Sequence, residues 1–149
     1  MSEHEEWKAP ELINAAEVMT PSPRTCSAFS TVLEAVMIFR ETDCGAVPIL
    51  EEGKVVAILT DRDVALAISE YPDLVKRPVT DIMTDGVVTV GPNDNLITVC
   101  EVLQTQTVRR VVVVDATSQV LGIIGWADIA PVLSDRAMGK VVKTAVTPA

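Results

Sequence analysis

The chain repeats itself once, and this repeat limits the possible folds more than any other feature of the sequence. Met19 and Met83 set the shift between the two copies at 64 residues, and one inserted residue later makes it 65. The matching segments are Glu17–Thr20 with Asp81–Thr84, Ala46–Leu50 with Arg110–Val114, and Val56–Asp63 with Leu121–Asp128. A period of this length exceeds the periods of the common solenoids. The sequence therefore predicts two similar halves related by an approximate twofold axis.

Both halves show the same succession of patterns. A short extended piece precedes a helix with one apolar stripe, two apolar runs joined by a tight turn follow, and a second helix ends the half. The expected strands are 24–26, 47–50, 55–59, 87–90, 111–114 and 120–124, and the expected helices are 31–42, 61–69, 95–106 and 126–133. Candidate N-caps are Ser30 or Thr31 and Asp94 or Asn95. The predicted fold class is α/β, with two β-α-β-β-α repeats.

Composition agrees with a folded protein and limits its partners. Hydrophobic residues make up 48% of the chain and charged residues 22%, which is typical of globular domains. The net charge of −9 argues against general binding to nucleic acid or anionic membranes. The acidic start has no apolar run, and no stretch is long and apolar enough to span a membrane. We therefore expect a cytoplasmic protein whose cysteines are reduced.

The sequence offers little for catalysis. Its one histidine is His4, so a histidine-based triad or metal site is not expected. Asp61, Asp63 and Asp128 are conceivable Mg²⁺ ligands or paired carboxylates. However, they fall at helix starts in separate repeats, with no nucleophile or base beside them. We predict no catalytic residue, no metal ligand and no obligatory cofactor.

The order of the motifs, found twice, resembles that of CBS domains. The motifs are Met19-Thr20, Cys44–Ile49 and Val56–Asp63, and in the second copy Met83-Thr84, Val108–Asp115 and Gly122–Asp128. The resemblance covers residues 14 to 135 and implies a CBS domain at 14–71, a linker at 72–78, a second CBS domain at 79–135, and tails at 1–13 and 136–149. Such tandem pairs are often called Bateman modules.

This resemblance implies a regulatory, ligand-sensing module rather than an enzyme. CBS pairs often bind adenosine-containing ligands in clefts between their halves, commonly form dimers, and regulate an attached or partner protein. The expected partners are thus an adenine nucleotide as regulatory ligand, a second copy in a homodimer, and an unidentified regulated protein. The homodimer is expected to use the apolar helix faces of residues 31–42 and 95–106.

The strongest candidate site lies where the last strand of the first half becomes a helix. The resemblance implies that the Thr60 hydroxyl helps to hold phosphate and that Asp63 accepts hydrogen bonds from ribose hydroxyls. Arg62 could add charge-assisted bonds to phosphate. A Thr-x-x-Asp sequence is also an ordinary helix start, with Thr60 as N-cap. The capping and binding roles can coexist.

The second copy departs from this pattern because Gly125 replaces the hydroxyl residue, although Asp128 is retained. Arg109 and Arg110 could meet phosphate there, or simply be a solvated basic pair. The remaining candidates are Thr25 and Thr89 beside the base, and Ala46, Val47, Pro48 and Val111 as apolar walls. A plain structural role in strands or sheet core is the alternative for each of them.

The sequence does not decide the ligand. AMP or ADP is favoured over ATP because three arginines supply little charge for a longer polyphosphate. Adenosylmethionine and NAD(H) stay open. A ligand-free dimerisation adaptor is the other reading, with Gly125 marking a degraded site.

Overall fold

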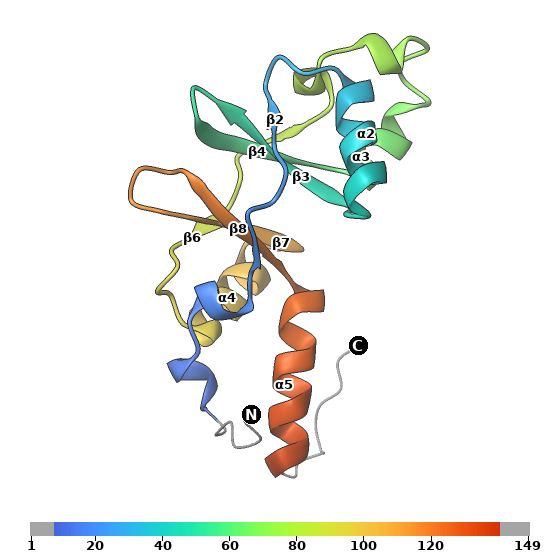
Figure 1. Ribbon diagram of the computed structural model, residues 1–149. Coiled ribbons are helices and arrows are strands. Elements are labelled where there is room, and N and C mark those ends of the chain that lie inside the picture. The colour runs from blue at the N-terminus through green and yellow to red at the C-terminus, as the bar shows by residue number, and fades with distance from the viewer. Residues whose placement is uncertain (1–7, 141–149) are drawn as a thin grey trace. The chain divides into compact units, whose positions relative to one another are not determined.

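The computed structural model describes residues 8–140, which divide into two compact units (Figure 1). The first-repeat unit consists of Ser22–Val87 and Val114–Leu121. The second-repeat unit consists of residues 8–21, Val88–Val113 and residues 122–140. Each unit contains one four-stranded sheet. The predicted β-α-β-β-α order is confirmed in both repeats.

The first-repeat unit has the strand order β2-β3-β4-β5. Its strands are β2 (Cys26–Ser27), β3 (Ala46–Glu51), β4 (Lys54–Thr60) and β5 (Thr84–Asp85), and its helices are α2 (Val32–Thr42) and α3 (Asp61–Ala67). Strand β2 runs parallel to β3, whereas β3, β4 and β5 pair in antiparallel fashion. Two short 3₁₀ turns, Leu74–Lys76 and Val79–Asp81, lie between α3 and β5.

Helix α2 begins where its sequence supplies a complete cap. The Thr31 hydroxyl accepts a hydrogen bond from the Glu34 amide at 3.2 Å, and the Glu34 carboxylate accepts one from the Thr31 amide at 2.8 Å. These two bonds satisfy amides that have no partner inside the helix. The helix ends at Thr42, and the next residue, Asp43, is its C-cap with a φ of 54° in the left-handed region. Thr31, rather than Ser30, is therefore the N-cap.

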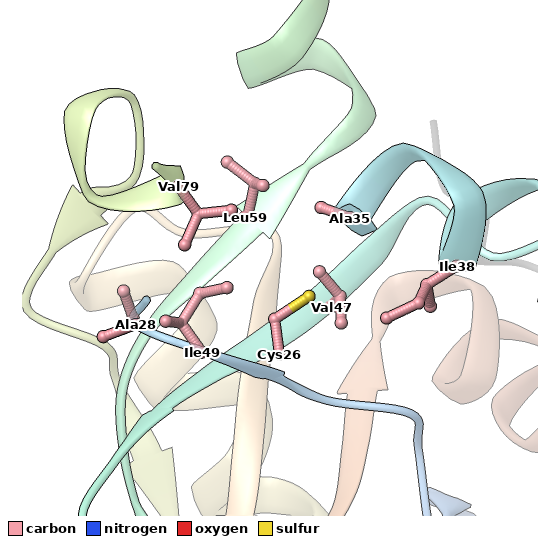
Figure 2. Close-up of a cluster of buried hydrophobic side chains, with 9 residues drawn as sticks. Cys26, Ala28, Ala35, Ile38, Val47, Ile49, Leu59 and Val79 are labelled. Carbon is pink, nitrogen blue, oxygen red and sulfur yellow. The ribbon is translucent and has the colours of Figure 1, made fainter. Parts of the chain in front are cut away.

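The core of this unit lies between one face of the sheet and helix α2 (Figure 2). Val47 and Ile49 of β3 point into it together with Leu59 of β4, and each has no exposed surface. Helix α2 contributes Ala35 and Ile38. Because successive side chains of a strand point to opposite faces, the residues between these apolar positions lie on the other face of the sheet.

The second-repeat unit has the strand order β1-β8-β7-β6. Its strands are β1 (Thr20–Pro21), β6 (Thr89–Val90), β7 (Arg110–Val114) and β8 (Val120–Gly125). Its helices are α1 (Ala15–Val18), α4 (Leu96–Thr105) and α5 (Trp126–Lys140), and a 3₁₀ turn covers Pro10–Leu12. The side chain of Asn95 caps α4 by accepting a hydrogen bond from the Thr98 amide at 2.9 Å. Asn95 is thus the N-cap, rather than Asp94.

The two repeats exchange their first short strands. Strand β1, from the start of the first repeat, pairs with β8 of the second, with Thr20 opposite Ile123. Strand β5, from the start of the second repeat, pairs with β4 of the first, with Thr84 opposite Ile58. Each compact unit therefore contains the Met-Thr motif of the other repeat. Neither short strand is predicted from the sequence.

Helix α5 is longer than predicted. It continues to Lys140, seven residues beyond the expected end at Leu133. Pro131 lies inside the helix, but no glycine or second proline follows until Gly139. A continuous run of residues compatible with a helix explains the extension. Within residues 8–140, no helix combines the length and apolar character that crossing a bilayer requires.

Candidate functional site

Thr60 and Asp63 form a reciprocal pair at the junction of β4 and α3. The Thr60 amide donates a hydrogen bond to Asp63 Oδ2 at 2.9 Å, and the Asp63 amide donates one to Thr60 Oγ1 at 3.1 Å. Both side chains are only partly buried. The capping role considered for these residues is therefore present. Among the described residues, no hydrogen bond reaches Asp63 Oδ1, which leaves an acceptor available to a ligand.

Several other predicted residues lie on the same face of this sheet as Thr60. Ala46 is directly opposite Thr60, and Pro48 is two residues further along β3. Thr25 precedes Cys26, which pairs with Ile49 in the parallel register, so the register brings Thr25 beside Pro48. We call this surface, which faces away from α2, the first site face: Thr25, Ala46, Pro48, Ile58 and Thr60.

Val47 does not share this face. Its side chain lies in the core cluster against α2 and has no exposed surface. An apolar wall for a ligand would therefore come from Ala46 and Pro48, not from the side chain of Val47. Arg62 lies on the exposed surface of α3, and no ion pair holds it within the described part of the chain. Its guanidinium is free to meet an anion.

Thr25 also borders a cavity of about 330 Å³ beside α2, together with Ser27, Ser30 and Met37. The ion pair between Arg24 and Glu41, at 3.0 Å, contributes to its lining. Burial raises the pKa of the adjacent Cys26 thiol, so this sulfur is a weak nucleophile at neutral pH. We find no constellation there suited to catalysis.

Asp128 occupies the matching position in the second-repeat unit, with different partners. Its Oδ2 accepts a hydrogen bond from the Gly125 amide at 2.9 Å, as Asp63 does from Thr60. Its Oδ1 accepts a second bond, at 3.3 Å, from the hydroxyl of Thr20. Thr20 is not among the site residues predicted from the sequence. The repeated Met-Thr motif was the available signal, but it does not say which sheet the motif joins.

Arg110 and Gly125 are complementary in size. A Cβ atom added to Gly125 would lie 3.4 Å from Arg110 Cγ and 3.4 Å from the Arg109 carbonyl oxygen, so the stem of Arg110 runs past this glycine. At the matching place in the first repeat, Ala46 lies opposite Thr60. One unit thus combines a small residue with a hydroxyl, and the other combines a cation with glycine.

The other candidates of the second repeat are divided between the two faces of its sheet. Thr89 pairs with Val112, so these two residues share a face with Arg110. Val111 is fully buried and lies on the opposite face, as Val47 does in the first repeat. Arg109 is exposed just before β7. We call the surface that carries Thr20, Thr89, Arg110 and Gly125 the second site face.

A metal centre finds no support in the described residues, where no three histidine, cysteine, aspartate or glutamate side chains gather closely enough to hold an ion. The two site faces instead offer hydroxyls and the Arg110 guanidinium, and the carboxylates of Asp63 and Asp128 lie at their ends. These groups can hold a ligand by hydrogen bonds and charge.

Comparisons with known proteins agree with this architecture. A family model described as CBS domain matches residues 15–70 and 79–135. The CBS domain-containing protein YhcV of Bacillus subtilis is 31% identical over 114 residues, covering 76% of this chain and 81% of the relative. Hypoxic response protein 1 of Mycobacterium tuberculosis is 27% identical over 139 residues, covering 92% of this chain and 96% of the relative.

Solved structures have the same fold. The CBS domain pair of protein MJ0100, in complex with 5′-methylthioadenosine and S-adenosyl-L-methionine, superposes with a TM-score of 0.75 at 25% identity, covering 84% of this chain and 98% of that one. The CBS domain protein PAE2072 of Pyrobaculum aerophilum, complexed with AMP, gives a TM-score of 0.74 at 21% identity, covering 85% and 99%. The predicted fold class is confirmed.

Proposed function

Because the chain belongs to the CBS domain family as a tandem pair, we propose that it senses an adenine nucleotide and thereby modulates a partner protein. CBS pairs are in general regulatory rather than catalytic modules. MJ0100 and PAE2072, two structures with this fold, hold adenosine-containing compounds. The expectation that the ligand bridges the two repeats stays a prediction.

One observation carries the proposal. In both repeats a carboxylate at the start of a helix is fixed by an amide of the preceding strand end, at 2.9 Å for Asp63 and 2.9 Å for Asp128. Asp63 lies at the end of a face with apolar and hydroxyl side chains, and Asp128 at the end of a face with hydroxyls and Arg110. An ionised carboxylate accepts hydrogen bonds from a vicinal diol. The strand residues beside Asp63, Ala46 and Pro48, are buried and apolar, as the walls of purine sites are.

The cations near these carboxylates favour a nucleotide with few phosphates. Arg110 lies beside Gly125 on the second site face, and Arg62 and Arg109 are exposed. Each guanidinium can form paired bonds to phosphate. The chain carries a net charge of −9, so additional phosphates would meet repulsion that three arginines do not offset. We therefore propose AMP or ADP as the ligand.

Asp63→Asn tests the proposal. The carbonyl oxygen of asparagine can still accept the hydrogen bond from the Thr60 amide, so the cap is largely kept. The amide nitrogen replaces the free carboxylate oxygen and cannot accept a bond from ribose. Hydrogen bonds to charged groups contribute about 1.5–3 kcal/mol, so calorimetric affinity for AMP at this site should fall about tenfold or more.

Asp61→Asn is the matched control. Asp61 is exposed in the first turn of the same helix, so its substitution removes the same charge from the same dipole without touching the pair of Thr60 and Asp63. AMP affinity should change little. An equal loss of AMP affinity in both variants would show a general effect of charge. If Asp63→Asn lowers the stability but leaves AMP affinity unchanged, Asp63 serves only to cap the helix.

A ligand-free dimerisation adaptor is the second candidate, favoured by one surface of the first-repeat unit. Phe29, Leu33 and Met37 follow one another at intervals of four residues and are 87%, 47% and 43% exposed. Phe29 lies just before α2, and the other two lie on it; we call these three residues the apolar stripe of α2. Such a surface marks an interaction site, and we propose a homodimer through it. If the protein is a stable dimer and no adenosine compound raises its melting temperature, it is an adaptor and not a nucleotide sensor.

A further inference from the structure

Thr20 supplies the hydroxyl that Gly125 lacks in the second-repeat unit. Strand β1 places Thr20 opposite Ile123, and Ile123 and Gly125 lie on the same face of β8. From there the Thr20 hydroxyl donates to Asp128 Oδ1 at 3.3 Å. In the first repeat, the hydroxyl near the carboxylate belongs to Thr60 itself, which caps α3. Thr20 thus provides a hydroxyl at Asp128 from a place 108 residues away in the sequence.

The segment that carries Thr20 is firmly docked on this unit. We call residues 8–21 the arm. Backbone bonds join the Ala15 amide to the Asp94 carbonyl at 2.7 Å and the Ala16 amide to the Pro92 carbonyl at 3.0 Å. The Ile13 carbonyl accepts from the Leu96 amide at 2.8 Å. Thr20 is therefore held in place by contacts that do not involve its own side chain.

The matching residue of the first-repeat unit has no such role. Thr84 lies opposite Ile58, as Thr20 lies opposite Ile123. Within the described residues, its hydroxyl makes no hydrogen bond to Asp63, whose bonded partner is the Thr60 amide. The two sites are therefore built differently, and the chain offers its own control position for Thr20.

We propose that Thr20 is a positioning and specificity residue of the second site, where it reads the ribose diol together with Asp128. This inference rests on the proposed function. The hydroxyl has one proton and two lone pairs. Its proton is used by Asp128, so its lone pairs remain to accept a bond from one ribose hydroxyl. Asp128 Oδ1 retains a lone pair for the other. The second site therefore depends on a docked arm, and the first does not.

Thr20→Val removes the hydroxyl and keeps a β-branched residue suited to a strand. To isolate the second site, the substitution is made in the Asp63→Asn background and AMP binding is measured by calorimetry. Loss of a neutral hydrogen bond should lower affinity about threefold to tenfold. Affinity for 2′-deoxy-AMP should fall less, which reduces the preference for AMP. Thr20→Ser should restore both values.

Two controls decide the interpretation. Thr84→Val is made in the Asp63→Asn background, and AMP affinity should equal that of Asp63→Asn alone. Thr20→Val is also made in the Asp128→Asn background, where binding reports the first site, and AMP affinity should equal that of Asp128→Asn alone. Hydrogen exchange at the Ala15 and Ala16 amides should stay slow in Thr20→Val. If exchange becomes fast as affinity falls, Thr20 acts only by holding the arm and the inference is overturned. Unchanged affinity in Thr20→Val also overturns it, whereas absent AMP binding in the wild-type protein would overturn the proposed function as well.

Discussion

Gly122→Ala should lower the stability of the second-repeat unit, because there is no room for a methyl group at this position. The added Cβ would lie 2.4 Å from Met19 Sδ, 2.7 Å from Met19 Cγ and 2.9 Å from the Thr20 carbonyl oxygen. The Met19 side chain would have to move, and losing part of its buried area costs about 1 kcal/mol. Overpacking adds about 1–3 kcal/mol, and replacing glycine in a strand returns about 0.5–1 kcal/mol.

The net loss in the free energy of unfolding is then about 1–3 kcal/mol, or roughly 2–12 °C in melting temperature for a chain of this size. Urea unfolding followed by circular dichroism measures it. At the matching position of the first repeat, Ala57 already carries a Cβ and is fully buried. A methyl group is therefore tolerated at this strand position in the first repeat, whereas at Gly122 it is excluded by the close approach of Met19 and of the Thr20 carbonyl oxygen.

A double-mutant cycle isolates this cause. In a Met19→Ala background, the atoms at 2.4 Å and 2.7 Å are gone, so Gly122→Ala should cost at least 1 kcal/mol less than it does in the wild-type chain. The Thr20 carbonyl at 2.9 Å remains, so a small cost should persist. If Gly122→Ala is equally destabilising in both backgrounds, contact with Met19 is not the reason for the glycine.

Two further predictions concern the first-repeat surface and the thiols. Met37→Glu places a charge on the apolar stripe of α2 and should shift the proposed dimer toward monomer in light scattering, and an unchanged mass would exclude this stripe from the interface. Exposed Cys44 should react with an alkylating reagent before Cys26 and Cys100, because burial raises the pKa of both of those thiols. Peptide mass spectrometry after short exposure at pH 7–8 checks the order, and equal labelling of all three would refute it.

The longer elements could be predicted because their patterns are strong. The apolar periodicity of 31–42 and 95–106 gave helices that agree with α2 and α4 to within one residue at each end. The run at 47–50 and its partner at 55–59 also gave a hairpin that the structure contains. The local spacing of apolar residues is enough to predict these elements without knowledge of their tertiary contacts.

The short strands and the orientation of the site could not be predicted in this way. Strand β1 has two residues, too few to show a period, and its partner in β8 is about 100 residues distant. Ala46, Val47 and Pro48 are all apolar, so the sequence does not reveal which of them faces α2. The pairing of Ala46 with Thr60 settles it. Thr20 was missed for the same reason, because its role depends on a distant partner.

The exchanged first strands also set the order in which the two sheets can form during synthesis of the chain. All four strands of the first-repeat sheet lie between Cys26 and Asp85, so this sheet can close while the second repeat is still being synthesised. Strand β1 has no partner until Ile123 has been made. At about 5–20 residues per second, the 108 residues from Thr20 to Asp128 take roughly 5–20 s to translate. Strand β1 thus leaves the ribosome before every other strand of the two sheets, yet it is among the last to pair.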